Sequence, residues 1–358
     1  MQLFFLVGLC ALVQLIDAYN ELDSFSLKNL HKLSTNRLNL NSSDNLNHFM
    51  HLNKTRVPGS KESIEVQNYI INHFQTLDEA TDGGIPWRVE LDNFQENGYN
   101  FTNLVFSKDP VYSTNTDKST KYIVIAAHYD SLIQPKGFIG AIDSAVSCGI
   151  LLDIAESISQ SIDDIFQDFA YDMNIGIKFV FFDGEEAIDR WSPEDSIHGA
   201  RHLFSKWKGQ SIINQIELFL LLDLLGAPDV NYVPSYFSAT HDNYNDLSLL
   251  ENKLIHFFPS LFDTSQLTSQ SYQNKFLAPP EENFKRENNG FIEDDHIPFW
   301  KAGVPILHLI PDVFPKQWNT IDDDFNHVDL QAIQRWNMLL TAYILEYLEV
   351  PEINQSAE

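Results

Sequence analysis

The sequence predicts one α/β domain built on a largely parallel sheet with helices on both faces. Continuous apolar runs such as "YIVIAA", "IKFVFF" and "IELFLLL" are typical of strands buried on both sides, and helical patterns alternate with them. Of the 358 residues, 44% are hydrophobic, which is enough apolar material for one large core. Length alone would allow two domains, but single α/β domains often reach this size.

The N-terminal third predicts two helices and two strands. A helix is expected over 24–33, followed by an Asn-rich loop. After a Pro-Gly turn, Ser60 is a candidate helix cap, and an apolar stripe at helical spacing follows it: Ile64, Val66, Tyr69, Ile70 and Phe74. Two strands are expected near 87–91 and 103–107.

The rest of the chain supplies the centre of the predicted sheet. Four buried strands are expected, at 122–130, 177–186, 216–227 and 304–311. The segment 143–158 reads as an amphipathic helix between the first two strands, and 328–348 reads as a long closing helix. Fully apolar strands that alternate with helices indicate a parallel sheet covered on both faces.

Polar residues follow three of these strands at the point where each strand ends. His128 and Asp130 follow the first strand, Glu185 and Glu186 the second, and Asp223 the third. Ligands of such sheets bind beyond the carboxyl ends of the strands. We therefore expect one cleft to collect these side chains.

These polar residues also have purely structural interpretations. Asp143 stands where a helix cap belongs, the Glu185–Glu186 pair fits a solvated loop, and His128 fits a satisfied core histidine. Asp223 is flanked by leucines, and a buried carboxylate needs a partner or a metal. A metal site explains the set together, because converging carboxylates repel unless a cation neutralises them, and Asp, Glu and His suit zinc. One acid of the pair would coordinate the metal, and its neighbour would move protons.

The first 18 residues predict a secretory signal peptide cleaved after Ala18. Their apolar run is shorter than the roughly 20 residues of a membrane helix, although a signal anchor remains an alternative because the positive n-region is missing. Four sequons also favour export, at Asn41, Asn53, Asn100 and Asn354. Because Cys10 would leave with the signal peptide, Cys148 stands alone and no intramolecular disulfide is expected.

The net charge of −27 argues against nucleic acid and anionic lipid as partners. It is compatible with a secreted or vacuolar protein. We expect no membrane association after signal cleavage, and a monomer.

Eight ordered segments carry a specific resemblance. The chain resembles the glutaminyl-peptide cyclotransferases, relatives of the di-zinc aminopeptidases, in "AAHYDS", "AIDSAV", "FFDGEEA", "WSPEDSIHGARHL", "LLDLLGAP", "EDDHIPF", "GVPILHLIP" and "FPKQWNTIDDD". The resemblance implies a zinc aminopeptidase-like fold, a central mixed, mostly parallel twisted sheet with helices on both faces. It spans 56–350 as one catalytic domain, preceded by a helical and loop segment at 19–55 and followed by a tail at 351–358.

The resemblance also implies site roles, position by position. Asp143 and Glu186 match zinc ligands, and Glu185 matches the carboxylate that acts as acid and base. Asp223 and Asp294 match acidic partners of the reacting amide, while the pocket aromatics match Trp191, Phe314 and Trp318. His128 matches a ligand of the second metal in the aminopeptidases, which the single-zinc cyclases do not use.

The implied reaction closes an N-terminal glutamine into pyroglutamate. The free α-amine attacks the side-chain amide carbon, zinc polarises the amide oxygen, and Glu185 carries a proton from the amine to the departing ammonia. The substrates implied are peptides that begin with glutamine. The aromatic residues would exclude water, which would otherwise compete.

Two positions depart from the family pattern. The third zinc ligand of the family is a histidine, and Asn319 stands there, so zinc affinity is expected to fall because an amide oxygen is a weak donor. His308 and His327 lie near in sequence, but nothing in the sequence brings either to the metal. Cys148 matches half of a disulfide of animal members, whose other half is Ala127 here, and we expect a buried free thiol.

Three functions therefore stay open. The first is a zinc-dependent glutaminyl cyclase of the secretory pathway. The second is an aminopeptidase, for which His128, Asp143, Glu186 and Asp223 would supply four of five di-zinc ligands. The third is a relative that has lost catalysis because Asn319 replaces the histidine, but keeps the fold and binds N-terminal peptides or persists as a glycoprotein.

Overall fold

The computed structural model describes ten segments of the chain. They are residues 21–33, 37–40, 47–80, 83–111, 120–167, 174–229, 232–262, 275–278, 292–350 and 353. The predicted signal peptide and the sequons at Asn41 and Asn354 lie outside these segments, whereas Asn53 and Asn100 lie inside them and are exposed. Among the described helices, none combines the length and hydropathy needed to span a bilayer.

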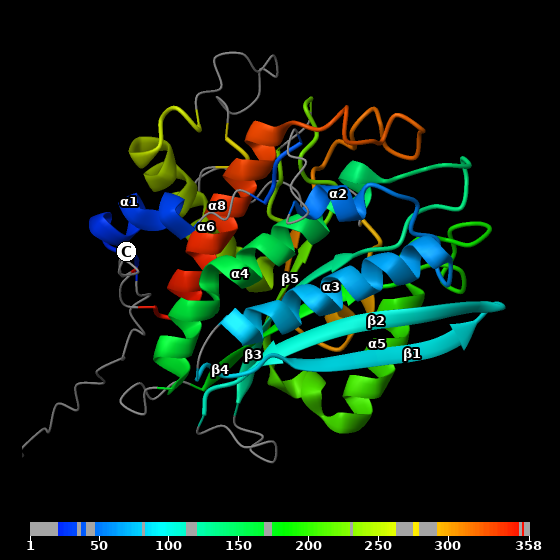
Figure 1. Cartoon of the computed structure of the whole chain (residues 1–358), viewed down its shortest axis with the longest axis horizontal. Helices are drawn as coiled ribbons and strands as arrows, with labels where there is room; N and C mark the ends of the chain where they lie inside the picture. Colours follow the sequence, from blue (N-terminus) through cyan, green and yellow to red (C-terminus); the bar gives the residue numbers. More distant parts are fainter. Residues whose placement is uncertain are drawn as a thin grey trace, which may run out of the picture.

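A six-stranded mixed sheet forms the centre of the fold (Figure 1). Its strands, in chain order, are β1 (Arg88–Glu96), β2 (Tyr99–Lys108), β3 (Lys121–His128), β4 (Ile175–Phe182), β5 (Ile216–Leu222) and β6 (Ile306–Leu309). The spatial order is β1-β2-β4-β3-β5-β6. β4, β3, β5 and β6 run parallel, while β1 and β2 form an antiparallel hairpin at one edge. The predicted fold class is confirmed.

Eight α-helices and three short turns complete the described chain. The helices are α1 (Ser24–Leu33), α2 (His48–Leu52), α3 (Lys61–Ala80), α4 (Val146–Gln167), α5 (His198–Gln210), α6 (His241–Phe257), α7 (Ile297–Lys301) and α8 (Leu330–Tyr347). The short turns are η1 (Ala141–Ala145), η2 (Ile212–Gln215) and η3 (Ser238–Thr240). Ser60 caps α3 as expected, since its hydroxyl accepts the N–H of Ser63 at 3.1 Å.

Alternate side chains of the parallel strands enter two separate cores. On β3, Ile123 and Ile125 belong to the larger core beneath α3, α4 and α8, whereas Val124 and Ala126 belong to the smaller core beneath α5 and α7. Figure 1 shows α3 and α4 lying across the sheet on its near side. Burial on both faces explains why these strands are continuous apolar runs.

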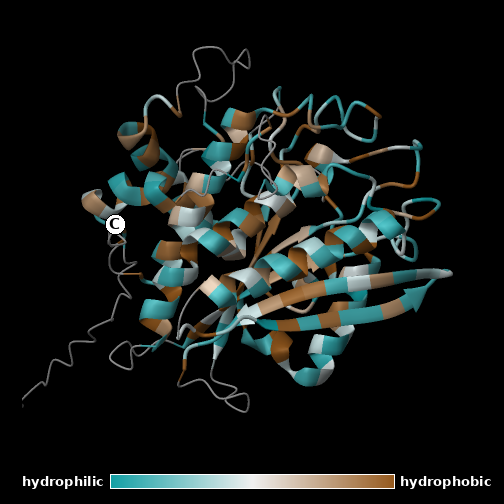
Figure 2. Cartoon of the chain, viewed as in Figure 1, coloured by the Kyte–Doolittle hydropathy of each residue, from teal (hydrophilic) through white to brown (hydrophobic). Residues whose placement is uncertain are grey.

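The edge hairpin is longer than the sequence predicted. Strands were expected over 87–91 and 103–107, and β1 and β2 extend well past both, joined by a turn at Asn97 and Gly98 with positive φ values of 50° and 84°. β1 is largely exposed, and Figure 2 shows hydrophilic residues interspersed with hydrophobic ones along it. The apolar pattern that marks the central strands is therefore weak here.

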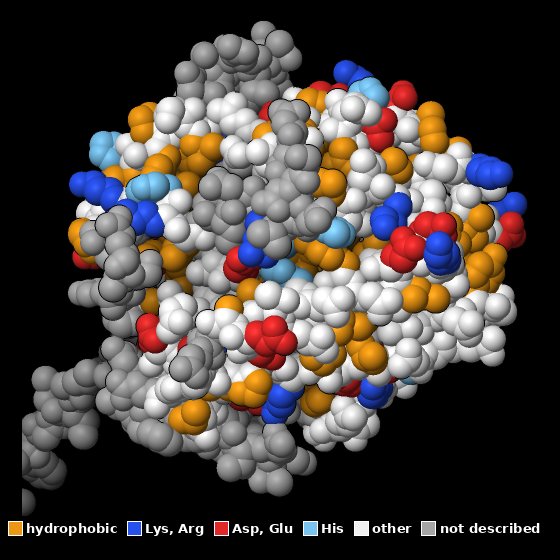
Figure 3. Space-filling view, in the orientation of Figure 1, with side chains coloured by type: hydrophobic (Ala, Val, Ile, Leu, Met, Phe, Trp, Pro, Cys, Tyr) orange, Lys and Arg blue, Asp and Glu red, His pale blue; other side chains and the backbone are white. Residues whose placement is uncertain are grey.

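Acidic side chains are scattered over the face of the molecule that Figure 3 shows. They lie among neutral and basic side chains of the described residues. No single acidic patch dominates this view of the described surface. Cys148 is fully buried in α4 and is a free thiol, as expected.

Candidate functional site

The loop that follows β3 is fixed by a buried arginine. The Arg56 guanidinium is inaccessible to solvent and donates to backbone carbonyls before α3, after β3 and before η1: Leu52, Lys54, Tyr129, Asp130, Ile139 and Gly140. These bonds join the two loops that carry Asp130 and Asp143. The position of both acids therefore depends on one side chain that the sequence did not single out.

Asp143 lies in the irregular turn η1 and not at a helix cap. Its φ of −114° and ψ of 79° are non-helical, and the regular helix begins only at Val146. The helix expected over 143–158 is confirmed from Val146 onward, but the interpretation of Asp143 as its cap is wrong. Asp323 accepts the N–H groups of Ile142 (2.7 Å) and Asp143 (3.2 Å) and so fixes the irregular turn before the helix. The Asp143 carboxylate faces Nε2 of His128 at 3.0 Å.

The turn after β4 presents the paired acids Glu185 and Glu186. Gly184 has a φ of 74°, and a Cβ there would overlap the ring of Phe101, so the turn requires glycine. The Asp130 carboxylate accepts the N–H of Glu185 at 3.1 Å and that of Glu186 at 3.2 Å. Both glutamates are buried, at 6% and 7% exposed, which contradicts the interpretation as solvated loop acids.

Asp223 completes a buried cluster at the carboxyl ends of the strands. Its Oδ1 accepts the hydroxyl of Ser144 and the N–H of Leu224 (2.8 Å), and it lies 3.5 Å from Nε2 of His128. His128, Asp143 and Asp223 offer ligand atoms that all lie within 4.8 Å of one another. The cluster therefore has the donor types and the spacing of a candidate metal site.

Asp294 is buried and is paired with His308. The His308 Nε2 atom and Asp294 Oδ2 lie 2.6 Å apart, and both residues are buried. The His296 ring lies beside that of His308, with centroids 4.5 Å apart and planes tilted by 44°. Asp294, His296 and His308 form a second group of close ligand atoms. His327 instead bonds Asp324 at the surface.

A cleft of about 640 Å³ opens over the acids. Its lining is Asp143, Glu185, Glu186, Trp191, Asp223, Leu224, Ile292, Glu293, Ile310, Phe314, Trp318 and Asn319. The indole N–H of Trp191 donates to Glu293 at 3.0 Å, and the rings of Phe314 and Trp318 meet edge to face at 4.8 Å. The cleft thus combines an acidic floor with an aromatic rim. Trp191 and Trp318 remain 39% and 41% exposed.

The predicted site residues divide between the cleft and the structure behind it. The metal, acid-base and aromatic candidates line the cleft together, with the exception of Asp294 and His128, which are buried and are not part of the lining. Asn319 is exposed on the cleft wall with a φ of 57°. Glu293, Leu224 and Ile310 line the cleft without a sequence signal of their own.

The buried charges of the site strongly perturb one another. Burial raises the pKa of Glu185 well above its usual range, with Glu186 and Asp294 adding to the effect and His128 opposing it. Burial and the Asp143 carboxylate raise the pKa of Glu186 in the same way. Burial would lower the pKa of His128, but its bonds to Asp130, Asp143 and Asp223 raise it well above its usual value. The cluster therefore holds more acid than its one histidine can neutralise.

A cation fits this floor. Glu186 Oε1 is buried and has no hydrogen-bond partner among the described residues, and leaving such an atom unpaired is unfavourable. Asp143 and Glu186 supply carboxylate oxygens on the cleft side, and the amide of Asn319 lies on the same cleft wall. His128 and Asp223 offer further donors beside Asp143. A divalent metal would satisfy the unpaired oxygen and relieve the repulsion.

The sequence and the fold are similar to those of known proteins. Residues 111–344 match the model of peptidase family M28. The chain is 41% identical over 308 residues to an uncharacterized protein of Saccharomyces cerevisiae, covering 83% of this chain and 82% of that one. It is 32% identical over 352 residues to a glutaminyl-peptide cyclotransferase of Drosophila melanogaster, covering 92% and 91%.

A solved structure agrees with these relatives. The crystal structure of Macrostomum lignano glutaminyl cyclase superposes with a TM-score of 0.74 at 29% identity, covering 94% of this chain and 96% of that one. The resemblance predicted from eight ordered segments is confirmed. The chain belongs to peptidase family M28 and, within it, to the glutaminyl-peptide cyclotransferases, and it is an enzyme of this type.

Proposed function

We propose that the protein cyclises the N-terminal glutamine of peptides to pyroglutamate with release of ammonia, and that the activity depends on zinc. The observation that carries the proposal is the pairing of Glu185 and Glu186 on Asp130, at the floor of a cleft with an aromatic rim. The related enzymes of Drosophila melanogaster and Macrostomum lignano carry the matching names.

Asp143 and Glu186 would hold the metal from the cleft floor, with Asn319 as a weak third donor. When bound, zinc would polarise the carbonyl of the substrate side-chain amide as a Lewis acid. The unpaired Oε1 of Glu186 supports this assignment. Asn319 is a neutral donor, so we expect weaker zinc binding than a histidine would give.

Glu185 would move the proton. The neutral α-amine forms a bond to the side-chain amide carbon, and the carbon–nitrogen bond to the amide NH₂ breaks. One proton leaves the attacking amine for Glu185 and reaches the departing NH₂, which leaves as ammonia. The raised pKa of Glu185 favours a group that both accepts and returns a proton.

Asp223 and the buried Asp294–His308 pair would orient the side-chain amide of the substrate and fix the positions of the protons around it. Trp191, Phe314 and Trp318 would close around the glutamine and limit access of water. Hydrolysis of the amide would give glutamate, so exclusion of water matters for the product.

Incubation of the purified chain from residue 19 onward with a glutamine-initiated peptide tests the proposal. Release of ammonia with the peptide otherwise intact supports it, and an acetylated copy of the same peptide is the control, because it has no free amine. Chelation should abolish the activity and zinc should restore it. Ammonia release that persists after complete metal removal would count against zinc dependence.

A metallopeptidase is the second candidate. The convergence of His128, Asp143 and Asp223 favours it, because these donors suit a metal even without Asn319. The same incubation separates the two functions, since a peptidase releases the first residue and a cyclase does not.

We also propose that the protein enters the secretory pathway, and is secreted or vacuolar. The exposure of the sequon asparagines Asn53 and Asn100 supports this proposal. Loss of mass on enzymatic deglycosylation of protein from its natural host would test it.

A further inference from the structure

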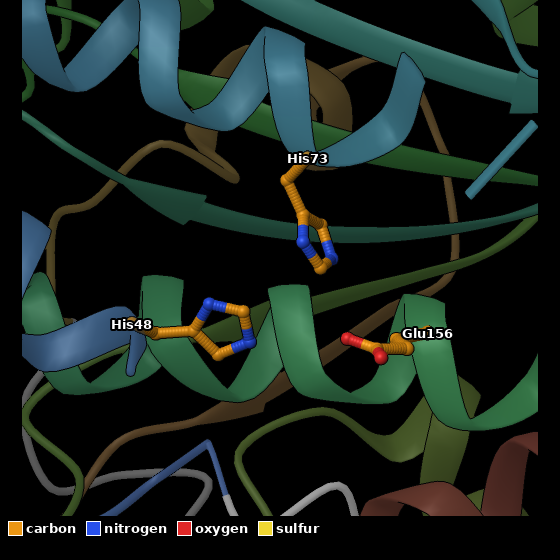
Figure 4. A group of neighbouring side chains, drawn as sticks. All are labelled: His48, His73 and Glu156. Carbon is orange, nitrogen blue, oxygen red and sulfur yellow. The ribbon is translucent and has the colours of Figure 1, made fainter. Parts of the chain in front are cut away.

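Three side chains from three helices converge outside the cleft (Figure 4). His48 begins α2, His73 lies in α3 and Glu156 lies in α4, and each offers a ligand atom within 4.8 Å of the other two. His48 and His73 are 0% and 6% exposed, and Glu156 is half-buried. None of the three lines the cleft over Glu185.

The hydrogen bonds of the two histidines define which nitrogens remain available. His73 Nε2 lies 3.0 Å from the carbonyl oxygen of Leu152, which only accepts, so Nε2 carries the proton and the lone pair is on Nδ1. His48 Nδ1 lies 2.8 Å from the hydroxyl of Tyr69. His48 Nε2 is buried and has no partner among the described residues. Each ring is therefore oriented on one side and open on the other.

Glu156 shows the same division between its two oxygens. Its Oε1 accepts from the Arg37 guanidinium at 2.7 Å, while Oε2 is buried without a partner in the described part of the chain. Figure 4 shows the carboxylate turned toward the imidazole of His48, with the ring of His73 entering the space between them. Two buried polar atoms without partners thus occur in one cluster, a placement that is unfavourable unless something binds there.

We propose that His48, His73 and Glu156 bind a zinc ion that fastens α2 to α3 and α4. Two imidazoles and one carboxylate form a three-ligand set typical of tetrahedral zinc, with water in the fourth position. Ligand atoms of such a site are separated by about 3.4 Å, so the present spacing of up to 4.8 Å requires only a small inward movement of the side chains.

The surrounding groups match those of a metal site. Metal-bound histidines usually donate their other N–H to a carbonyl or a similar acceptor, as His73 does to Leu152, and bound carboxylates are usually hydrogen-bonded, as Glu156 is to Arg37.

A metal here would stabilise the segment that precedes the site. The ring of Phe49 in α2 packs over Gly149 of α4 and against Phe325, and Arg56 follows four residues after Leu52 to hold the loops of Asp130 and Asp143. Zinc bound between the three helices would therefore raise the thermal stability of the whole chain without taking part in cyclisation.

The test uses a background variant that lacks the cleft ligands, Asp143→Asn with Glu186→Gln. After chelation and dialysis, zinc binding is measured by competition with a chromophoric chelator, and Co²⁺ is added separately to record its visible absorption. We expect the background variant to bind one zinc, to gain thermal stability from it, and to give the intense Co²⁺ absorption of a four-coordinate site.

Adding Glu156→Gln or His73→Gln to the background should weaken zinc binding at least about tenfold. Loss of a residue that only orients a ligand commonly costs this much, so loss of a ligand itself should cost no less. Glu62→Gln, an exposed change on α3, is the matched control and should bind as the background does. If His73→Gln does not fold, Glu156→Gln still tests the proposal, because its amide oxygen can accept from Arg37 and so preserve the local structure. A background that binds no zinc at micromolar concentration, or that binds equally well with Glu156→Gln, overturns the inference.

Discussion

The Asp130 carboxylate accepts the backbone N–H of Glu186 with one oxygen, at 3.2 Å, and the backbone N–H of Glu185 with the other, at 3.1 Å. Asp130 comes from the loop after β3 and Glu186 from the loop after β4, which are neighbouring parallel strands. These two hydrogen bonds therefore fix the position of Glu185 and Glu186 relative to the sheet. Because His128 also contacts Asp130, one buried carboxylate links the metal donors to the acid-base pair.

We predict that Asp130→Ala destabilises the protein and abolishes cyclisation. It would leave two buried N–H groups without an acceptor, each costing about 1–3 kcal/mol in the free energy of unfolding. Denaturant unfolding measures the stability, and ammonia release measures the activity. Asp189→Ala, at an exposed position of the following loop, is the control and should leave both unchanged. An Asp130→Ala variant as stable as the wild type would show that water replaces the carboxylate.

Replacing Glu185 or Glu186 by glutamine should impair the enzyme in two different ways. Glu185→Gln removes the proton carrier and should lower kcat by about 10²–10⁴-fold while zinc binding is retained. Glu186→Gln removes a ligand and should weaken zinc binding instead, so that excess zinc partly restores activity. Zinc titration and ammonia release on both variants check the division. If Glu185→Gln loses zinc and Glu186→Gln does not, the two roles are exchanged.

The parts that the sequence predicted are those with local physical signatures. The strands that became β3, β4 and β5 are uninterrupted apolar runs, and their carboxyl ends necessarily bring Glu185 and Asp223 to one edge. Contacts between distant segments have no such local signature. Asp323 accepts the N–H of Ile142, which lies 181 residues away in the sequence, and Arg56 donates to the carbonyl of Asp130, 74 residues away. The helix α5 was missed because Gly199 and many polar residues weaken its pattern.

We predict that Asn319→His raises zinc affinity at least about tenfold, because imidazole is a better zinc donor than an amide oxygen. The backbone there has a φ of 57°, a conformation that histidine tolerates better than most side chains. The rate of cyclisation at limiting zinc should rise in parallel. Asn319→Ala is the matched control and should not gain affinity. Unchanged affinity in Asn319→His would mean that the metal is held instead by His128, Asp143 and Asp223.

Lys178, which does not line the cleft, should make the free energy of unfolding depend on pH in the alkaline range. It lies in β4 at 5% exposure, with Nζ 3.9 Å from the ring centroid of Tyr122 and 5.9 Å from that of Trp207. Burial lowers its pKa from 10.5 to about 8, partly offset by Asp109 and Glu90 and reinforced by Arg88. Below about pH 8 the lysine is charged in both states, and the folded state bears the full cost of burying that charge.

Between pH 8 and 10.5 the unfolded chain binds the proton and the folded chain does not, so this residue's contribution to stability rises with pH and is complete above 10.5. Lys178→Met keeps the apolar stem and removes the charge. We therefore expect the variant to be more stable than the wild type by about 1–3 kcal/mol at pH 7, with the difference shrinking as the pH approaches 10.5. Urea unfolding of both proteins across this range measures it, with the exposed Lys136→Met as the control. A difference that stays constant with pH would mean that the lysine is not buried as a titrating charge.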